Sequence, residues 1–332
     1  MYYNVLTTTI KDIELEMKKF LSVNDVQDLN EIVKSALSIK ANPEAYGDVG
    51  KNKMLGLLFF NPSLRTRLST QRAARHLGMD VMVMNIDKDG WKIETEDGVI
   101  MDGDKAEHLK DAAAVISQYC DIIGVRSFPN LQDKEEDYAD GIMKDFVKYA
   151  HVPIVSLESA TRHPLQSLAD LVTIRENSDK PKKKVVLTWA PHPRALPQAV
   201  PNSFAEWMNA ADDVELVITA PEGYELDPEF VGDATFTTDQ DEALKDADFV
   251  YAKNWSSTTE YGKVVCKDNS WQVTEEKMAL TNNGKFMHCL PIRRNVVASD
   301  GVLDSDNSLI IEEANNRTFA AAAVLKAILE TE

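Results

Sequence analysis

The sequence predicts an α/β protein made of two doubly wound, parallel-sheet domains with the active site in the cleft between them. Short apolar runs alternate with helical segments along the chain, which favours parallel sheets joined by right-handed crossovers. The 332 residues suffice for two domains, each with its own core. Because the alternation comes in two successive sets, we expect domains at residues 1–155 and 156–311, with a terminal helix, 312–332, packing back on the first domain.

Composition argues against a membrane protein, a secreted protein and a protein built on disulfides. The apolar fraction of 44% and the charged fraction of 27% are typical of globular proteins. No apolar run approaches the ~20 residues that a membrane span needs, and the N-terminus lacks the pattern of a secretory signal. Cys120, Cys266 and Cys289 are too few and too scattered for a disulfide framework or a C-x-x-C metal site. We therefore expect a cytoplasmic protein without a membrane partner.

The formal net charge of −18 argues against nucleic acid as a partner, because an acidic surface repels phosphate backbones. An acidic protein can still bind small anions if its basic side chains are concentrated in one cleft. The motifs below indicate such a concentration.

The first half is organised around a strand, a sharp turn and a helix. The apolar run 54–60 reads as a buried strand, and Asn61-Pro62 breaks it. Ser63 stands where a helix N-cap belongs, ahead of a helical pattern over 64–77. A helix that begins directly after a buried strand is a common anion-binding arrangement.

The start of this helix carries donors suited to a phosphate. The backbone N–H groups of Leu64, Arg65 and Thr66 have no partner within the helix, where the helix dipole also favours negative charge. Arg65 and Arg67 add charge-assisted donors, and the hydroxyls of Ser63 and Thr66 add neutral ones. The alternative is an ordinary capped helix with solvated arginines. A phosphoryl-transfer enzyme is disfavoured because G-x-x-x-x-G-K-[ST] is absent and no acidic pair stands out for Mg²⁺.

The other elements of the first half follow the same alternation. Residues 1–16 add little core pattern, so this segment is either an extension or a docked N-terminal helix. Between 86 and 104 lies a polar loop that carries Trp91, which indicates a surface anchor for a subunit or a ligand, or else local packing. The remaining helices are expected over 25–39, 105–119 and 140–149, and the remaining strands over 79–85, 120–126 and 152–157.

Polar side chains stand at the ends of two of these strands. Arg126 ends one strand and Glu158 follows the next, and ligands of open α/β sheets bind beyond the carboxyl ends of strands. His163 and Gln166 lie three residues apart at the start of a helix over 167–175, so both can face one ligand. The alternative for a histidine before a proline is a cap or a core group.

The second half repeats the arrangement. Strands are expected over 185–189, 214–219, 249–253 and 286–290, and helices over 203–210, 241–246 and 275–280. Basic groups again follow strands: His192 and Arg194 in a proline-stiffened loop, then Lys253, and Arg293 after the last strand. A final alanine-rich helix over 312–329 carries Arg317 in its first turns.

Three motifs together resemble one known family. Ser63-Leu64-Arg65-Thr66-Arg67, His163-Pro164-Leu165-Gln166 and His288-Cys289-Leu290-Pro291, in this order and spacing, resemble the signature set of the aspartate/ornithine carbamoyltransferase superfamily. The resemblance covers the chain from about residue 17 to its end. It implies transfer of a carbamoyl group from carbamoyl phosphate to an amine, without a metal ion or an organic cofactor.

Finer features resemble the branch that uses N-acylated ornithine. They are Met101-Asp102-Gly103-Asp104 with Glu107-His108, then Pro191-His192-Pro193, then Arg293-Arg294-Asn295. Enzymes of this branch that use acetylornithine carry an acidic residue where Ala106 stands and a lysine where Val297 stands. The chain has neither, which implies N-succinyl-L-ornithine as the acceptor, in arginine biosynthesis. Acetylornithine and a non-catalytic relative that binds carbamoyl phosphate are the alternatives.

Electrostatics supports the difference at position 106. The succinyl group brings a further carboxylate, and a glutamate 4 Å from it would cost up to ~4 kcal/mol at an effective dielectric near 20. Arg194, Arg293 or His192 can then meet that carboxylate, and the sequence does not choose among them.

The resemblance also implies roles for individual residues. The catalytic set comprises Arg65, Thr66, Arg126, His163 and Gln166. The carbamoyl-phosphate site comprises Ser63, Leu64, Arg65, Thr66, Trp91, Arg126, His163, Gln166, the backbone carbonyls of Cys289 and Leu290, and Arg317. The acylornithine site comprises Glu158, His192, Lys253 and Arg293. Because Trp91 is implied to come from an adjacent subunit, we expect a homotrimer.

Overall fold

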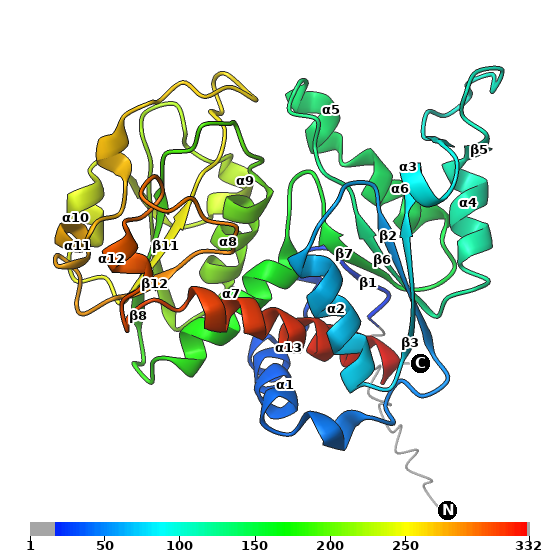
Figure 1. Cartoon of the computed structure of the whole chain (residues 1–332), viewed down its shortest axis with the longest axis horizontal. Helices are drawn as coiled ribbons and strands as arrows, with labels where there is room; N and C mark the ends of the chain where they lie inside the picture. Colours follow the sequence, from blue (N-terminus) through cyan, green and yellow to red (C-terminus); the bar gives the residue numbers. More distant parts are fainter. Residues whose placement is uncertain (1–16, 331–332) are drawn as a thin grey trace, which may run out of the picture.

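The computed structural model describes residues 17–330. Residues 1–16, expected as an extension or a docked helix, lie outside the described residues. The chain forms two parallel five-stranded sheets that lie side by side with helices around them (Figure 1). The predicted fold class is therefore confirmed.

The first sheet has the strand order β1-β7-β6-β2-β3, and all of its pairings are parallel. Its strands are β1 (Lys19–Phe20), β2 (Met54–Phe59), β3 (Asp80–Asn85), β6 (Ile122–Arg126) and β7 (Ile154–Glu158). Since β2 is a buried interior strand, flanked by β3 and β6, its carboxyl end lies inside the sheet rather than at its margin. The sequence therefore placed the strand-turn-helix motif in the correct part of the fold.

The second sheet has the order β10-β9-β8-β11-β12 and is also parallel throughout. Its strands are β8 (Lys183–Trp189), β9 (Val214–Thr219), β10 (Thr235–Thr237), β11 (Phe249–Lys253) and β12 (Lys285–Met287). In the first sheet the strand order changes direction between β2 and β6, and in the second between β8 and β11, as in doubly wound folds.

The helices of the first half are α1 (Leu29–Ala41), α2 (Arg65–His76), α3 (Ile86–Asp89), α4 (Leu109–Ile116), α5 (Lys134–Ala139), α6 (Gly141–Tyr149) and α7 (Pro164–Glu176). Those of the second half are α8 (Ala199–Ala210), α9 (Pro228–Val231), α10 (Gln240–Leu244), α11 (Glu275–Met278), α12 (Asp300–Leu303) and α13 (Ile310–Leu329). Short 3₁₀ helices lie at η1 (Val23–Asp25), η2 (Pro43–Tyr46) and η3 (Asn269–Trp271). Within residues 17–330, no helix is both long and apolar enough to cross a membrane.

The segment before α4 differs from the sequence-based prediction. The helix expected over 105–119 begins only at Leu109, where His108 caps it by accepting from the backbone N–H of Lys110. The preceding residues form β5 (Glu107–His108), which pairs with β4 (Ile93–Glu94). The chain between these two strands projects from the body of the first half (Figure 1). Pairing with β4 keeps residues 107–108 extended, and the helix therefore starts later.

The terminal helix α13 connects the two halves. It packs against α1, α2 and α7 of the first half, as Figure 1 shows, and it also contacts β12 of the second sheet. Ala320, Ala321, Ala322 and Ala323 are buried in these contacts, and their small side chains allow the helices to approach closely. The expected return of this helix to the first half is thus confirmed.

The boundary between the domains is not marked by a break in the chain. β7 spans the predicted division between 155 and 156, and it belongs to the first sheet. It is followed by α7, which is buried from Pro164 to Ile174 and contacts helices of both halves. The residue ranges of the two domains stay predictions.

Phe319 gives a test of how much α13 contributes to stability. Its ring is buried and stacks on His76 of α2, with the ring centroids 6.0 Å apart. Phe319→Ala should therefore lower the free energy of unfolding by about 3–5 kcal/mol, as measured by urea denaturation. The control is Ile311→Ala on the exposed face of the same helix, which should change it by less than about 0.5 kcal/mol. Equal effects of the two variants would contradict this packing.

Candidate active site

A cavity of about 220 Å³ lies where the carboxyl ends of both sheets meet α2, α7 and α13. All of the predicted site residues line it except Leu64, Trp91 and Arg293. The residues that line the cavity are Ser63, Arg65, Thr66, Arg126, Phe128, Glu158, His163, Gln166, His192, Leu196, Pro197, Val200, Lys253, Cys289, Leu290, Pro291 and Arg317. Residues far apart in the sequence therefore form one polar chamber.

The start of α2 supplies one wall of this cavity. Ser63 is not the N-cap that the sequence predicted: the helix begins at Arg65, and Leu64 occupies the N-cap position without a side-chain cap hydrogen bond. The backbone N–H groups of the first turn therefore have no competing side-chain acceptor from the cap residue. These N–H groups can therefore donate to a bound anion, whereas a side-chain cap would compete for them.

Two arginines flank this helix start. Arg317, from α13, donates through Nη2 to Oγ1 of Thr66 over 2.6 Å, although the two residues are 251 positions apart. Burial lowers the pKa of both Arg65 and Arg317, while Glu158 and Cys289 act in the opposite direction. Nε of Arg65 is buried without a hydrogen-bond partner among the described residues. Because guanidinium groups stay charged in proteins, this wall of the cavity is short of negative charge.

Arg126 also lines the cavity and is held by three acceptors. Its Nη2 contacts Oε2 of Glu158 over 2.8 Å, and its Nη1 donates to the carbonyls of Asn61 and Pro62 at 3.2 Å each. Both side chains of the Arg126–Glu158 ion pair are buried. The turn after β2 and the end of β7 therefore fix the orientation of this guanidinium.

His163 lies beside both Glu158 and Arg317. Its Nε2 lies 3.7 Å from Oε2 of Glu158 and 3.5 Å from Nη2 of Arg317. Burial lowers the pKa of His163 well below its ordinary value, and the charges of Arg317, Arg126 and Lys253 lower it further. The imidazole is therefore neutral near pH 7 and keeps one donor and one acceptor nitrogen.

Gln166 lines the cavity from α7 and is fully buried. Its Nε2 donates to Oδ1 of Asp170 at 2.8 Å and to Oε1 of Glu313 at 3.1 Å. Sequence reasoning missed both carboxyls. A signal existed, because Asp170 follows Gln166 by four residues and Glu313 precedes Arg317 by four, which places each pair on one helix face.

The segment after β12 forms the floor on the side of the second sheet. The backbone N–H of His288 donates to Oε2 of Glu313 at 2.8 Å, and that of Leu290 donates to Nδ1 of His288 at 2.8 Å. Burial lowers the pKa of His288 well below its ordinary value, and a neutral ring is what Nδ1 needs in order to accept. Cys289 and Leu290 thus face the cavity in a fixed conformation.

The remaining predicted basic residues are His192, Lys253 and Arg293. His192 and Lys253 line it, and Arg293 lies behind His192, with Nε donating to Nε2 of His192 at 3.1 Å. Nδ1 of the same ring lies 2.8 Å from the carbonyl oxygen of Arg194 and donates to it. The proline-rich loop and the segment after β12 are therefore joined through one imidazole.

Two predicted residues stand away from the cavity. Leu64 is 69% exposed, and Trp91 is 59% exposed just before β4, where the projecting loop begins. The indole Nε1 of Trp91 donates to Oε2 of Glu107 at 2.8 Å, which holds the ring at the base of this loop. Within one chain, Trp91 therefore does not reach the cavity that its own chain forms.

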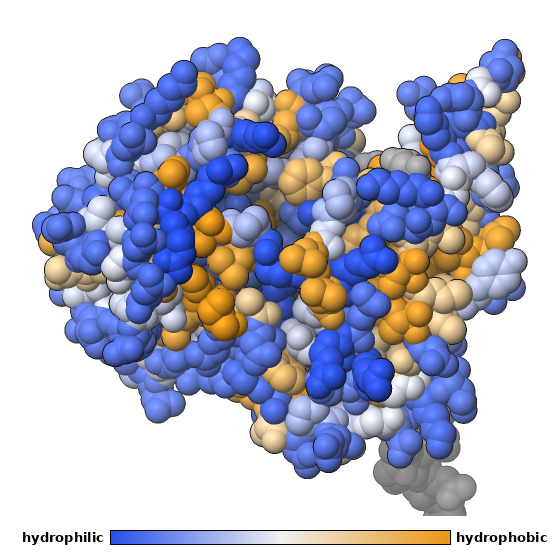
Figure 2. All heavy atoms as spheres, in the orientation of Figure 1, coloured by the Kyte–Doolittle hydropathy of each residue, from blue (hydrophilic) through white to orange (hydrophobic). Residues whose placement is uncertain are grey.

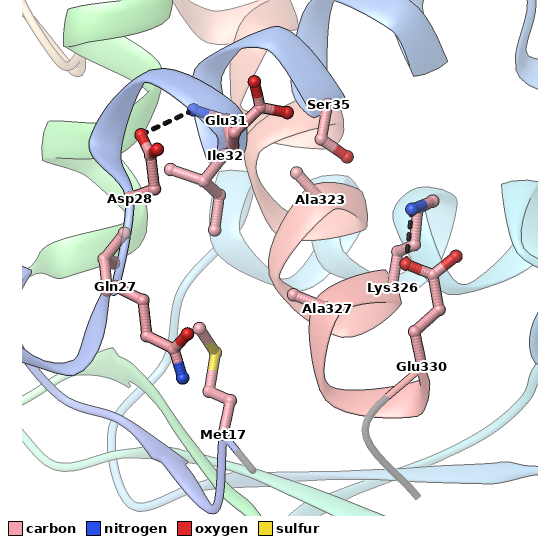
Figure 3. Close-up of a pocket in the computed structure, with 11 residues that line it drawn as sticks. Met17, Gln27, Asp28, Glu31, Ile32, Ser35, Ala323, Lys326, Ala327 and Glu330 are labelled. Carbon is pink, nitrogen blue, oxygen red and sulfur yellow. Dashed lines mark hydrogen bonds and ion pairs between the residues drawn. The ribbon is translucent and has the colours of Figure 1, made fainter. Parts of the chain in front are cut away.

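A larger cavity of about 390 Å³ lies between α1 and the end of α13 (Figure 3). Among the described residues that line it, Asp28, Glu31 and Glu330 are acidic, and Lys326 is paired with Glu330. This lining is unsuited to a doubly charged anion. The chamber at the sheet ends is the better candidate, although it is smaller.

Known proteins resemble the chain over most of its length. The profile described as "Aspartate/ornithine carbamoyltransferase, carbamoyl-P binding domain" matches residues 18–176, and "Aspartate/ornithine carbamoyltransferase, Asp/Orn binding domain" matches residues 198–328. The N-succinylornithine carbamoyltransferase of Bacteroides thetaiotaomicron is 55% identical over 95% of this chain and 99% of its own length. The N-acetylornithine carbamoyltransferase of Xanthomonas campestris pv. campestris is 38% identical over 95% and 98%.

A solved structure shares the fold. It is that of a glutamate-to-alanine variant of N-acetyl-L-ornithine transcarbamylase in complex with carbamyl phosphate and N-succinyl-L-norvaline. The TM-score is 0.88 at 38% identity, and the match covers 94% of this chain and 99% of that one.

Two parallel sheets that meet at an arginine-rich chamber define a group-transfer enzyme for anionic small molecules. The chain belongs to the aspartate/ornithine carbamoyltransferase family, and it is a carbamoyltransferase.

Arg65 allows a direct test of the anion wall. Arg65→Ala removes a charged donor from the start of α2, so we expect the rate of carbamoyl transfer to fall by about 10²–10³-fold while the fold is retained. The rate is measured by formation of the ureido product, and folding by circular dichroism. The matched control is Arg75→Ala on the exposed far end of α2, which should retain full activity. Wild-type turnover by Arg65→Ala would refute the assignment.

Proposed function

We propose that the chain transfers the carbamoyl group of carbamoyl phosphate to the δ-amine of N-succinyl-L-ornithine, in the cytoplasm and as a step of arginine biosynthesis. The products are N-succinyl-L-citrulline and phosphate. The observation that carries the proposal is the convergence of Arg65, Arg126 and Arg317 on one cavity. Such a cluster suits a doubly charged phosphate ester.

The reaction needs no further reactant. The neutral amine attacks the carbonyl carbon, the bond from that carbon to the phosphate oxygen breaks, and the departing phosphate takes the proton of the amine. The protein supplies alignment and electrostatic stabilisation. In this scheme residues 1–155, completed by 312–332, bind carbamoyl phosphate, and residues 156–311 bind the acylornithine.

The phosphate is proposed to lie at the start of α2. Ser63, the backbone of Leu64, Arg65 and Thr66 would hold its oxygens, and Arg317, which already bonds Thr66, would neutralise part of its charge. A bound dianion would offset the mutual repulsion of the buried guanidinium groups. The phosphate is therefore expected to bind most tightly where the guanidinium groups lie closest together.

The carbonyl oxygen gains negative charge as the amine attacks. Arg126, the neutral ring of His163 and the hydroxyl of Thr66 are the proposed donors to it. Gln166 and the carbonyls of Cys289 and Leu290 would accept from the carbamoyl NH₂. The cysteine is therefore used through its backbone.

The acylornithine is proposed to bind beside His192, Lys253 and Arg293, where the charges of Lys253 and Arg293 complement its carboxylates and the neutral ring of His192 offers a hydrogen bond. Glu158 would orient the amino end, and its pairing with Arg126 places its carboxylate close to the reacting carbonyl. The choice of succinyl over acetyl rests on two findings: the relative named for N-succinylornithine is the more similar one, and the acetylornithine variant with N-succinyl-L-norvaline has lost a glutamate.

The position of Ala106 bears on this choice. Ala106 is exposed, and it lies on the projecting loop beside Trp91 and Glu107 rather than in the cavity of its own chain. Its influence on the acyl group therefore requires that the loop reach the site of another subunit. Val297, by contrast, is buried in the second half and does not line the cavity.

A homotrimer would bring this loop to a neighbouring site. An apolar surface suited to association covers the outer face of α2 and the edge strand β3, where Figure 2 shows apolar side chains gathered. Its exposed members are Leu64, Leu68, Met82 and Met84. Exposed apolar area of this kind commonly marks a subunit interface.

The acceptor is tested by assaying carbamoyl transfer to ornithine, N-acetyl-L-ornithine and N-succinyl-L-ornithine in parallel. The succinyl compound should have the largest kcat/KM. Ala106→Glu should reverse the preference towards the acetyl compound, because the new carboxylate repels the succinyl group, whereas neutral Ala106→Gln should change the ratio by less than about threefold. An unchanged ratio in Ala106→Glu would contradict the electrostatic argument, and transfer only to free ornithine would contradict the proposed acceptor.

The shared site is tested by mixing inactive variants. Arg65→Ala disables the site of its own subunit, and Trp91→Ala disables the site to which its loop is donated. Unfolded together and refolded, the two variants should regain a substantial part of wild-type activity, since some sites then combine an intact Arg65 with an intact Trp91 from the neighbour. Activity no higher than that of either variant alone would show that Trp91 does not act across subunits.

A further inference from the structure

The side-chain amide of Gln166 is held from behind by two buried carboxyls. Its Nε2 donates to Oδ1 of Asp170 on the same helix and to Oε1 of Glu313 on α13. Asp170 and Glu313 are almost fully buried, and neither lines the cavity. Both amide hydrogens of Gln166 therefore point away from the ligand.

The other end of the amide has no partner in the described chain. Oε1 of Gln166 is buried without a hydrogen bond, although Gln166 lines the cavity. Unpartnered buried acceptors are rare in folded proteins. The amide thus presents an acceptor, and no donor, to whatever occupies the cavity.

The two carboxyls act as a unit. Burial raises the pKa of Asp170 to about 7, and burial together with the neighbouring Asp170 raises the pKa of Glu313 well above its ordinary value. The pair therefore holds one proton near neutral pH, as close carboxyls do. Hydrogen bonds with Gln166 and Glu313 and the charge of Arg317 act in the opposite direction on the pKa of Asp170 and offset part of this rise.

Glu313 has a second contact on the other side of the cavity. Its Oε2 accepts from the backbone N–H of His288, which fixes the segment carrying Cys289 and Leu290. Each oxygen of Glu313 thus accepts from one N–H donor. A single carboxyl positions both groups of acceptors that face the cavity, one on α7 and one after β12.

We propose that Asp170 and Glu313 are a positioning pair that turns the carbonyl oxygen of Gln166 into the cavity, so that the site selects an acyl phosphate bearing an NH₂ group over one bearing a methyl group. The inference rests on the proposed placement of the carbamoyl NH₂ beside Gln166. A flipped amide would aim its oxygen at the Asp170 carboxylate, which is unfavourable. The orientation of Gln166 is therefore fixed before the ligand binds.

Isosteric variants separate this role from simple packing. In Asp170→Asn, the amide oxygen still accepts from Gln166 and the NH₂ replaces the shared proton, so the orientation is kept. In Glu313→Gln, one of the two acceptors becomes an NH₂ that faces a donor, either Gln166 or the N–H of His288. Asp170→Leu removes an acceptor outright. Replacing a carboxylate by an amide should therefore be tolerated at Asp170 but should weaken binding at Glu313.

The experiment measures binding to the purified full chain by titration calorimetry, without the acceptor substrate. The probes are fresh carbamoyl phosphate, acetyl phosphate and inorganic phosphate. Glu313→Gln and Asp170→Leu should weaken carbamoyl phosphate about 10- to 100-fold, while acetyl phosphate and phosphate change by less than about threefold. Asp170→Asn should bind all three within about threefold of wild type.

Two further variants keep the test decisive. In a Gln166→Leu background, Asp170→Leu should cause no additional loss, because its effect passes through Gln166. The control is Thr173→Val, at a buried position one turn after Asp170 on α7. The hydroxyl of Thr173 accepts from Asn316 and does not contact Gln166, so this variant should leave the binding of all three probes unchanged. Thermal unfolding identifies any variant that does not fold, in which case the remaining variants decide.

Three results would overturn the inference: equal weakening of all three probes, equal effects of Asp170→Asn and Glu313→Gln, or an additive loss in the Gln166→Leu background. Binding of carbamoyl phosphate without transfer to any acylornithine would instead contradict the proposed function, and it would leave the selectivity measurement valid.

Discussion

The site depends on the burial of like charges beside one another. Arg65, Arg126 and Arg317 share a chamber with a single carboxylate, that of Glu158. Removing cations from water is costly, and their mutual repulsion adds to the cost, so the rest of the fold must enforce this arrangement. An anion relieves it. An overall charge of −18 and a cationic pocket are therefore compatible, because the positive charge is concentrated where solvent is excluded.

The arginines are held in place by elements that lie far apart in the sequence. Arg126 is fixed by the end of β7 and by the turn after β2, whereas Arg317 comes from α13 and reaches Thr66 across 251 positions. Since α13 packs on α1, α2 and α7 of the first half and also contacts β12 of the second, the chamber closes only when the whole chain has folded. A binding site made in this way cannot persist in an isolated half, which ties ligand affinity to global stability.

Much of this could be predicted from the sequence, for identifiable reasons. Alternating strands and helices gave the fold class, and charged residues at strand ends gave Arg126, Glu158 and Lys253, because parallel strands present their carboxyl ends at one edge. The N-cap at Ser63 was wrong, since the turn geometry rather than residue preference sets where α2 begins. The late start of α4 was not predicted, because β5 pairs with β4, and β4 has no strong hydrophobic pattern that would mark it as a strand.

The carboxyls behind the site were missed for a different reason. The four-residue spacings place Asp170 beside Gln166 and Glu313 beside Arg317, but the contact of Glu313 with Gln166 joins two helices, and no local pattern encodes it. Their placement separates two physical tasks within one chamber. Exposed or flanking cations bring charge to attract substrate, and the buried carboxyls fix the directions in which neutral groups donate and accept. The first task tolerates changes of a few ångströms, whereas the second depends on hydrogen-bond geometry and therefore lies in the most tightly packed part of the molecule.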